Sequence, residues 1–334
     1  MHIAIIGAAG MIGRKLIARL MKDGAPGGGA IDALTLIDIV MPQAPDGFAG
    51  RLACLAEDLS LAGVADRLVA TRPDLIFHLA AIVSAEAETD FELGYRINLD
   101  GMRLLLDSIR LAHRDDFYRP RLVFTSSIAV FGAPFPDKIG DDFIEAPLTS
   151  YGTQKAISEL LLSDYSRKGF VDGIGIRLPT ICVRPGKPNK AASGFFSGII
   201  REPLNGQEAI LPVGDDVRHW HASPRSAVGF LVRAASMDLQ LLGARRNLSM
   251  PGISSTVGEQ IEALRKVAGD KAVRLIRRVP DEMIMRIVAG WARDFDTARA
   301  LSLGFVADAS FEDIIRIHIE DELSPAQRED LRSR

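Results

Sequence analysis

Short apolar runs alternate with amphipathic stretches through the first half of the chain. The apolar runs fall at residues 3–6, 33–39, 52–55, 75–79, 122–125 and 174–179. Between them, apolar residues recur at helical spacing over residues 11–22, 61–70, 98–112 and 150–167. Strands that alternate with helices predict βαβ units, and strands that are apolar throughout predict a sheet covered on both faces. The pattern therefore predicts an α/β fold with a doubly wound parallel sheet of the Rossmann type.

The sequence pattern changes after Pro179, where further prolines divide the chain into shorter predicted elements. Apolar periodicity there predicts helices near residues 194–201, 223–236, 256–268, 295–303 and 311–319. We expect residues 1–178 to form the sheet domain, with residues 215–250 returning to it. We expect residues 179–214 and 251–334 to form mostly a smaller C-terminal substrate lobe over the carboxyl edge of the sheet, where doubly wound folds bind ligands.

Composition narrows the classes of function. The chain has 40 basic and 43 acidic residues and a formal net charge of −3, a balance that gives no general attraction to nucleic acid or to an anionic membrane. No apolar run is long enough to predict a membrane span. Its two cysteines, Cys54 and Cys182, lie among apolar residues and are typical of a reducing compartment. We therefore expect a cytoplasmic protein.

A glycine-rich turn lies between the first predicted strand and the first predicted helix. Gly7, Gly10 and Gly13 would let the chain turn sharply, approach a pyrophosphate closely and pack the helix on the sheet. The start of that helix, which includes Met11 and Ile12, would present free N–H groups to the phosphates. Placed after a strand and before a helix, this motif predicts a dinucleotide site.

Side chains at the ends of the next strands refine that prediction. Asp38 ends the second strand, where a carboxylate binds both ribose hydroxyls and repels a 2′-phosphate, so we expect NAD and not NADP. Asp58 and Leu59 follow the third strand; Asp58 either contacts adenine or caps the next helix. After the fourth strand, Ala80 is small enough for a cofactor to lie against it, whereas the preceding His78 is expected to be a packed core residue.

Tyr151 and Lys155 are the candidate catalytic pair. They are four residues apart in a predicted helix and so share one face. A phenol is a poor base at neutral pH, but a nearby ammonium lowers its pKa. Ser126 and Ser127 end the fifth strand at the same edge of the sheet, so either hydroxyl could hold a substrate oxygen beside the phenol. The alternative is a helix-surface pair with two serines that only cap a strand.

Together these motifs resemble the extended short-chain dehydrogenase/reductase family, which includes nucleotide-sugar epimerases. The likeness extends over nearly the whole chain, to residues 98–101, 126–132, 177–179 and 294–305. It implies that Tyr151 is the base, that Lys155 modulates it, and that Ser127 or Ser126 polarises the substrate. It also implies that Asn98 steadies the helix and the cofactor side, and that Thr180 and Ile181 contact the nicotinamide carboxamide.

Departures from the family pattern indicate a small substrate. Nucleotide-sugar enzymes usually carry Asn three residues after the arginine of the sixth strand, whereas Thr180 follows Arg177 here. The resemblance extends to family members that oxidise a four-carbon sugar acid at C2. A carboxylate needs a cationic partner, and Ser84 is placed to bind substrate. The candidate cations are Arg184, Lys187, Lys190 and Arg218.

Three classes of function stay open. The first is an NAD-dependent sugar-acid dehydrogenase, and the second is a nucleotide-sugar epimerase or dehydratase that retains NAD tightly. The third, a non-catalytic dinucleotide-binding regulator, is disfavoured by the intact Tyr151 and Lys155. His219 and His221 lack further residues at ligand spacing, so we expect no metal. The helices at 98–112 and 150–167 carry apolar residues on more than one side, and the resemblance implies that they pair in a homodimer.

Overall fold

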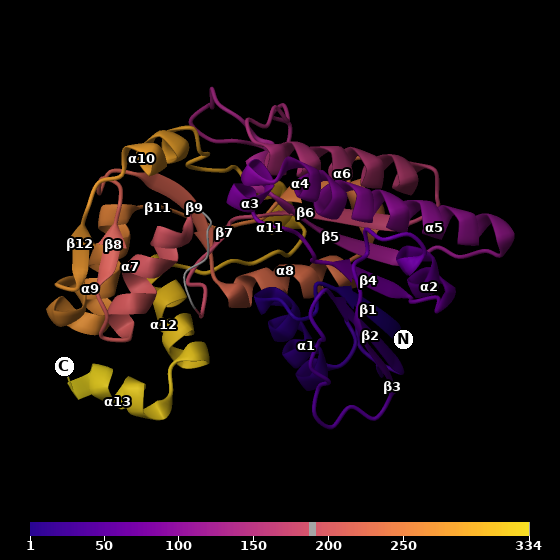
Figure 1. Cartoon of the computed structure of the whole chain (residues 1–334), viewed down its shortest axis with the longest axis horizontal. Coiled ribbons are helices and arrows are strands. Elements are labelled where there is room, and N and C mark those ends of the chain that lie inside the picture. The colour runs from indigo at the N-terminus through magenta and orange to yellow at the C-terminus, as the bar shows by residue number, and fades with distance from the viewer. Residues whose placement is uncertain (187–191, 334) are drawn as a thin grey trace.

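A seven-stranded parallel sheet forms the centre of the molecule in the computed structural model, which describes residues 1–186 and 192–333 (Figure 1). Its strand order is β10-β6-β5-β4-β1-β2-β3, and every neighbouring pair is parallel. The strands are β1 (His2–Ile6), β2 (Ala33–Asp38), β3 (Arg51–Ala56), β4 (Leu75–His78), β5 (Arg121–Ser127), β6 (Asp172–Leu178) and β10 (Asn247–Ser249). The predicted sheet is confirmed, because these strands pair in parallel and the apolar residues of β1, β4, β5 and β6 are buried as expected.

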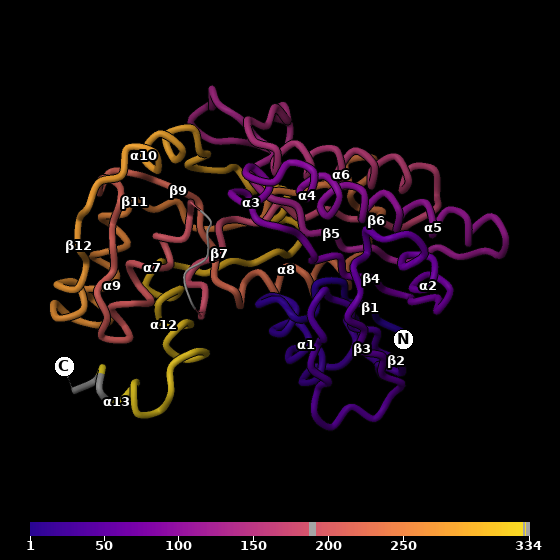
Figure 2. Tube along the Cα trace, viewed as in Figure 1, coloured from indigo at the N-terminus to yellow at the C-terminus, as the bar shows by residue number. Residues whose placement is uncertain are grey.

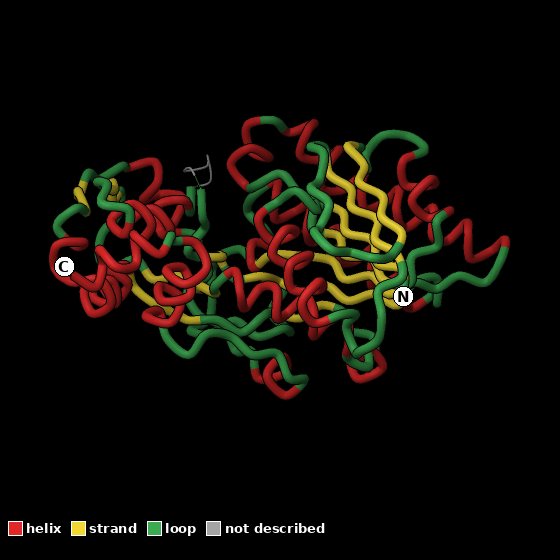
Figure 3. Tube along the Cα trace, turned by 90° about the horizontal axis from the view of Figure 1, so that it is seen from below, coloured by secondary structure: helices red, strands yellow, loops and turns green. Residues whose placement is uncertain are grey.

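Helices cover both faces of this sheet, as a doubly wound fold requires (Figures 1 and 3). One face packs on α1 (Met11–Asp23) and α8 (Pro224–Ser236). The other face packs on α2 (Val64–Ala70), α5 (Gly101–Asp115) and α6 (Ser150–Arg167). The order in which strands are added to the sheet reverses between β1 and β4, and doubly wound folds bind ligands in the crevice at the carboxyl ends of such strands.

The C-terminal lobe has its own core and lies beside the carboxyl edge of the sheet (Figure 2). It contains two small sheets. The first consists of β7 (Thr180–Ile181), β9 (Arg218–Ala222) and β11 (Ile253–Thr256), and the second of β8 (Ala209–Leu211) and β12 (Ile276–Arg278). Its helices are α7 (Gly194–Leu204), α9 (Val257–Val273), α10 (Glu282–Ala289), α12 (Phe311–Glu322) and α13 (Pro325–Ser333). The helix α9 begins at a capping box in which Thr256 and Glu259 satisfy each other's backbone N–H groups.

The division into domains stays a prediction, but the packing bears on it. The helix α8 and the strand β10, both within residues 215–250, pack on the seven-stranded sheet. Ala300 of α11 (Ala298–Ser302) and Phe305 also join that core, although we expected residues 251–334 mostly in the other lobe. Phe305 packs against Phe230, so this segment crosses back beneath the sheet.

Several elements differ from the sequence prediction. The helix predicted over 98–112 begins with a π-helical turn, Arg96–Asp100, before α5. The helices α3 (Ser84–Thr89), α4 (Phe91–Tyr95) and α10, and the strands of the lobe, had no clear periodic signal. They are short, and a short element gives too few repeats for its period to be distinguished.

The homodimer also stays a prediction. The helices α5 and α6 lie side by side over one face of the sheet (Figure 1), and they expose Leu111 and Leu160. Among the helices described, none is both long and apolar enough to span a membrane.

Candidate active site

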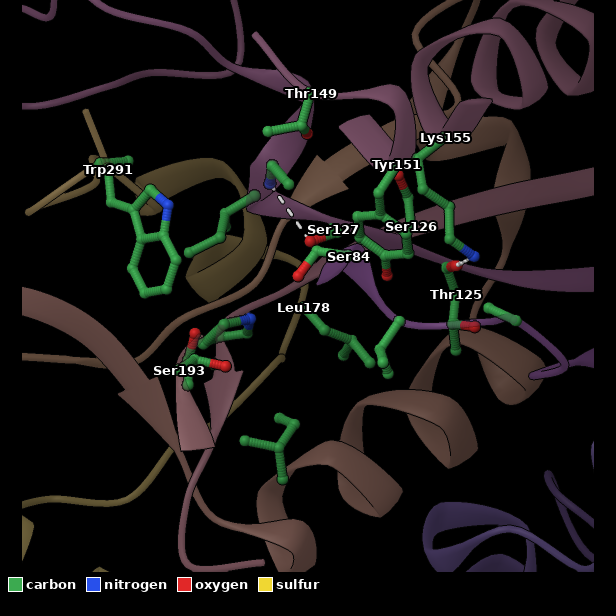
Figure 4. Close-up of a pocket in the computed structure, with 18 of the residues that line it drawn as sticks. Ser84, Thr125, Ser126, Ser127, Thr149, Tyr151, Lys155, Leu178, Ser193 and Trp291 are labelled. Carbon is green, nitrogen blue, oxygen red and sulfur yellow. Dashed lines mark hydrogen bonds between the residues drawn. The ribbon is translucent and has the colours of Figure 1, made fainter. Parts of the chain in front are cut away.

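A cavity of about 460 Å³ opens at the carboxyl edge of the sheet, between the sheet and the C-terminal lobe (Figure 4). The glycine turn lies at one part of its wall, and the catalytic candidates lie at another. The predicted residues that line it are Gly7, Gly10, Met11, Ile12, Gly13, Ser84, Ser126, Ser127, Tyr151, Lys155, Thr180, Ile181 and Arg184. The structure thus brings together candidates that are far apart along the chain.

The glycine turn fits a dinucleotide. Gly7 has a φ of +90°, and a Cβ there would lie 2.7 Å from the backbone nitrogen of Ala80. A Cβ on Gly13 would lie 2.3 Å from the carbonyl oxygen of Gly7, so the helix α1 packs on the turn as no larger residue allows. No side chain caps the N-terminus of α1, and no acidic residue occupies its first turn. Its N–H groups therefore remain available to phosphate oxygens.

Asp38 lies beside this turn at the end of β2. One of its carboxylate oxygens accepts a hydrogen bond of 2.9 Å from the backbone N–H of Ala9. The carboxylate is thus held at the edge of the turn, where a ribose would follow the pyrophosphate, and its negative charge opposes a 2′-phosphate.

Replacing Asp38 with Asn should weaken the preference for NAD over NADP. The amide oxygen can still accept from Ala9, but the negative charge is lost. Since like charges in contact cost several kcal/mol, we expect the ratio of kcat/KM for NAD to that for NADP to fall at least roughly tenfold. Steady-state rates with each cofactor measure it. Asp58→Asn is the matched control, and an equal fall in that variant would contradict the role of Asp38.

The other predicted cofactor residues surround the cavity without lining it. Asp58 accepts hydrogen bonds from Ser60 and from Arg96, whose Nη1 lies 2.6 Å away. Burial opposes its charge, but these bonds hold the pKa of Asp58 below its usual value. Leu59 is buried in the core under α2 and α5. The Asp58 carboxylate is therefore already hydrogen-bonded within the protein, to Ser60 and Arg96.

Asn98 joins two elements behind the cavity. Its side-chain oxygen accepts from the backbone N–H of Ile82 at 2.9 Å, and its Nδ2 donates to Gln154 of α6 at 2.7 Å. The residue is buried, so it fixes α6 relative to the chain that leaves β4. His78 is also buried, and burial lowers its pKa to about 3. It is therefore a neutral core histidine, as expected.

Tyr151 and Lys155 lie on the cavity side of α6 (Figure 4). The helix begins where the Thr149 side chain accepts from the backbone N–H of Gly152. The Lys155 Nζ donates to the carbonyl oxygen of Thr125 at 2.8 Å and lies 5.7 Å from the centre of the Tyr151 ring. One helical turn and the end of β5 thus hold both side chains.

The charges around this pair differ from the expectation. Burial raises the pKa of Tyr151, and the cation that opposes the rise is Arg184, together with the Ser127 hydroxyl. We expected the Lys155 ammonium to act in this way. Burial instead lowers the pKa of Lys155 to about 7, against the opposing charge of Glu159. A lysine that is only partly protonated near neutral pH gives the phenol a weaker field than a full ammonium.

The two serines are not equivalent. Ser126 donates its hydroxyl to Glu159, a fully buried carboxylate that also pairs with Arg177 at 2.7 Å. Ser127 is partly exposed to the cavity, and its Oγ accepts from the backbone N–H of Ala129 at 3.2 Å. The Ser127 hydroxyl therefore lies beside Tyr151 in the cavity, within the space open to a substrate oxygen, whereas the Ser126 hydroxyl is bonded to Glu159.

The sequence of the chain matches the model of a known family. Residues 3–223 match the model of the NAD dependent epimerase/dehydratase family. This chain belongs to that family. The match confirms the resemblance to extended short-chain dehydrogenases, and it confirms an NAD-dependent enzyme that acts on a CH–OH group.

Two members of the family are similar to this chain over nearly its whole length. The D-erythronate dehydrogenase of Cupriavidus necator is 47% identical over 328 residues, which cover 96% of this chain and 98% of that protein. The D-erythronate dehydrogenase of Haemophilus influenzae is 42% identical over 320 residues, 96% of this chain and 99% of that protein. Motifs within 126–132, 177–181 and 184–189 indicate the same resemblance from sequence, and these relatives confirm it.

Two solved structures show how the family fold is shared. A nucleoside-diphosphate-sugar epimerase from Agrobacterium tumefaciens is 69% identical, covers 96% of this chain and 94% of its own, and superposes with a TM-score of 0.95. The L-threonine 3-dehydrogenase of Trypanosoma brucei, at 24% identity, covers 99% of this chain and 98% of its own with a TM-score of 0.82. The second likeness concerns the fold alone.

Within this family fold, the two candidate cations in described residues have different environments. Arg184 lines the cavity near Tyr151, and each affects the pKa of the other. Arg218 lies outside the cavity lining, where it pairs with Glu259 at 3.2 Å and donates to the carbonyl oxygen of Ser254 at 3.0 Å. Lys187 and Lys190 lie outside the described residues.

Sequence reasoning missed part of the wall. Trp291, in the segment that follows α10, lines the cavity, as do Thr149, Ser193 and His219. The sequence weighs His219 as a metal ligand, and by the family resemblance substrate-facing residues often lie in the segment 219–221 that contains it. Thr149 lines the cavity as the N-cap of α6, whereas Trp291, Ser193 and His219 reach it through the packing of the C-terminal lobe, for which no local pattern gives a signal.

Proposed function

We propose that this enzyme oxidises the C2 hydroxyl of a short sugar acid such as D-erythronate and releases the 2-keto acid. NAD, when bound, supplies the acceptor for the hydride that leaves C2. The observation that carries the proposal is Arg184, a cation in the same cavity as Tyr151 and Ser127. The names of the two full-length relatives support the same substrate class.

The residues of the cavity divide the chemistry among them. Tyr151, as phenolate, takes the proton of the C2 hydroxyl as the C2–H bond breaks and the carbonyl forms. Ser127 donates a hydrogen bond to the developing carbonyl oxygen. Lys155, whose Nζ is held by the carbonyl oxygen of Thr125, helps to orient the phenol of Tyr151. Ser84, which also lines the cavity, hydrogen-bonds a substrate hydroxyl.

Arg184 selects for an acid. Its Nε donates to the carbonyl oxygen of Ile181 at 3.4 Å, and the residue lines the cavity. Within residues 1–186 and 192–333, no carboxylate pairs with it. A half-buried arginine without a counter-charge is unfavourable, and a substrate carboxylate bound bidentately relieves that cost.

The alternative is a nucleotide-sugar epimerase or dehydratase with tightly bound NAD, which the name of the Agrobacterium tumefaciens structure favours. One feature weighs against it. Thr180 replaces the usual Asn, and its hydroxyl contacts His219 at 2.7 Å.

The deciding experiment compares substrates and one variant. Purified enzyme with NAD should form NADH steadily with D-erythronate or L-threonate and form none with UDP-glucose, as followed by absorbance. Arg184→Gln should raise the KM for the acid roughly tenfold or more, because a charge-assisted bond is lost, and should change the KM for NAD little.

Arg218→Gln is the matched control, because it removes the same charge from outside the cavity. It should leave both KM values near those of the wild type. Epimerisation of UDP-glucose without net NADH would favour the alternative function. A rise in the KM for NAD alone in Arg184→Gln would place the arginine on the cofactor.

A further inference from the structure

A tryptophan forms the wall of the cavity opposite Lys155. Figure 4 draws Trp291 across the cavity from Lys155, with Ser127 and Tyr151 between them. Lys155 lies on the sheet side, where the glycine turn also lies, so the space between Ser127 and Trp291 is the part left for the substrate. The length of molecule that fits beside Tyr151 therefore depends on this indole.

Backbone contacts hold the segment around Trp291 to both lobes. The N–H of Trp291 bonds the carbonyl of Val288 at the end of α10 at 3.0 Å. Two residues later, the carbonyl of Arg293 accepts from Ser254 of β11 at 2.8 Å. Phe295 then forms an isolated parallel bridge with Ile139 of the sheet domain. The backbone of the segment is thus anchored at several points, and the Trp291 ring lies against the ring of His219.

His219 joins this segment to the strand that carries Thr180. Its Nδ1 donates to the carbonyl of Ala292 at 2.9 Å, and its Nε2 lies 2.7 Å from the Thr180 hydroxyl. Burial lowers the pKa of His219 to about 4, so the ring is neutral and Nε2 accepts from Thr180. The ring stacks on Phe196 with an interplanar angle of 8° and lies 5.1 Å from the Trp291 ring.

We propose that Trp291 sets the upper length of the sugar acid and that His219 is the residue that positions it. The indole closes the cavity at the end away from the reacting carbon, so an acid with extra hydroxymethylene groups meets its face. His219 determines where that face lies, because it bonds the residue next to Trp291 and contacts the ring itself. The inference rests on the proposed sugar-acid function and adds a limit on chain length to it.

The test measures kcat/KM for four-, five- and six-carbon aldonic acids that share the configuration at C2 and C3. In Trp291→Ala, the ratio of the six-carbon to the four-carbon value should rise at least roughly tenfold, because a pocket distinguishes each extra carbon by about that factor or more. The KM for NAD should stay near that of the wild type. Arg293→Ala is the matched control, since its side chain is exposed next to the same wall.

Variants of His219 test its positioning role. His219→Gln removes the ring that lies against Trp291 and Phe196, so it should shift the length ratio in the same direction but less. The double variant His219→Gln/Trp291→Ala should shift it no further than Trp291→Ala alone, because His219 acts through the indole. A purely structural histidine would lower activity with all three acids equally and leave the ratio unchanged, which would overturn its role.

An unchanged ratio in Trp291→Ala would overturn the proposal, and so would a shift of equal size in Arg293→Ala. Trp291→Phe, a smaller change, covers the case in which the alanine variant does not fold, and it should give an intermediate shift. Failure of the wild type on every aldonic acid would instead refute the proposed function. The two failures are therefore separate, because one concerns a ratio and the other the wild-type reaction.

Discussion

Replacing Tyr151 with Phe is expected to lower kcat for oxidation of the acid by about 10²–10⁴-fold. The substitution removes the phenolic oxygen that accepts the substrate proton and leaves the ring in place. The cap at Thr149 and the bond from Lys155 to Thr125 involve other atoms, so the helix should be unchanged. The KM for NAD and the midpoint of thermal unfolding should both stay close to those of the wild type.

The pH dependence gives a second readout of the same role. Only the phenolate accepts a proton, and burial raises the pKa of Tyr151, so the wild-type rate should rise as the pH increases above neutrality. That rise should be absent from the residual activity of Tyr151→Phe. Rates of NADH formation across a pH series measure both effects.

Tyr165→Phe supplies the control for this variant. Tyr165 lies in the same helix, but its hydroxyl donates to Asp107 at 2.8 Å and is remote from the cavity lining. Loss of that bond should leave kcat near the wild-type value. If Tyr151→Phe kept more than about a tenth of the activity, another group would have to be the base.

Replacing Arg177 with Met should destabilise the fold more than any surface change. The guanidinium bonds both oxygens of Glu159, at 2.7 to 3.1 Å, and it also pairs with Glu145 and, at 3.8 Å, with Asp141. Arg177 and Glu159 are buried. Because the substitution leaves buried carboxylates without a counter-charge, we expect the free energy of unfolding to fall by about 3–5 kcal/mol. Urea denaturation measures it.

The loss should depend on pH. Burial already raises the pKa of Glu145 to about 7, against the opposing charge of Arg177. Without Arg177 its pKa in the folded state rises further above the value in the unfolded chain. A carboxyl group of this kind favours the folded state at low pH and costs stability once both states are ionised. The destabilisation should therefore be larger at about pH 8 than at about pH 5.

Two further variants check the origin of the effect. Arg167→Met removes an exposed pair with Asp164 on the same helix as Glu159, and it should cost no more than about 1 kcal/mol. Adding Glu159→Met to Arg177→Met removes the strongest unpaired charge, so it should recover part of the lost stability. Equal losses in the buried and exposed arginine variants would contradict the assignment.

The sequence by itself determined the sheet and one half of the site. The apolar runs of β1, β4, β5 and β6 and the glycine turn are local patterns, so their signal is complete within a few residues. Tyr151 and Lys155 follow from a single helical spacing. Parallel strands bring their carboxyl ends to one edge, which is why local patterns at several strand ends predicted a common site.

Only the tertiary structure decided between equivalent candidates. Successive side chains of a strand point to opposite sides, but the sequence does not say which of the Ser126 and Ser127 hydroxyls is bonded to a buried carboxylate. The partner of Ser126 is Glu159, 33 residues away. Likewise, Arg184 and Arg218 carry the same charge, but Arg184 lines the cavity, whereas Arg218 lies outside that lining and pairs with Glu259.

The far wall of the site was beyond sequence reasoning altogether. Trp291 reaches the cavity because the C-terminal lobe folds back over the sheet, and it contacts His219, which lies more than 70 positions earlier. Such contacts depend on how two separately packed cores meet. Periodicity reports which face of an element is buried, but it carries no information about which distant element covers that face.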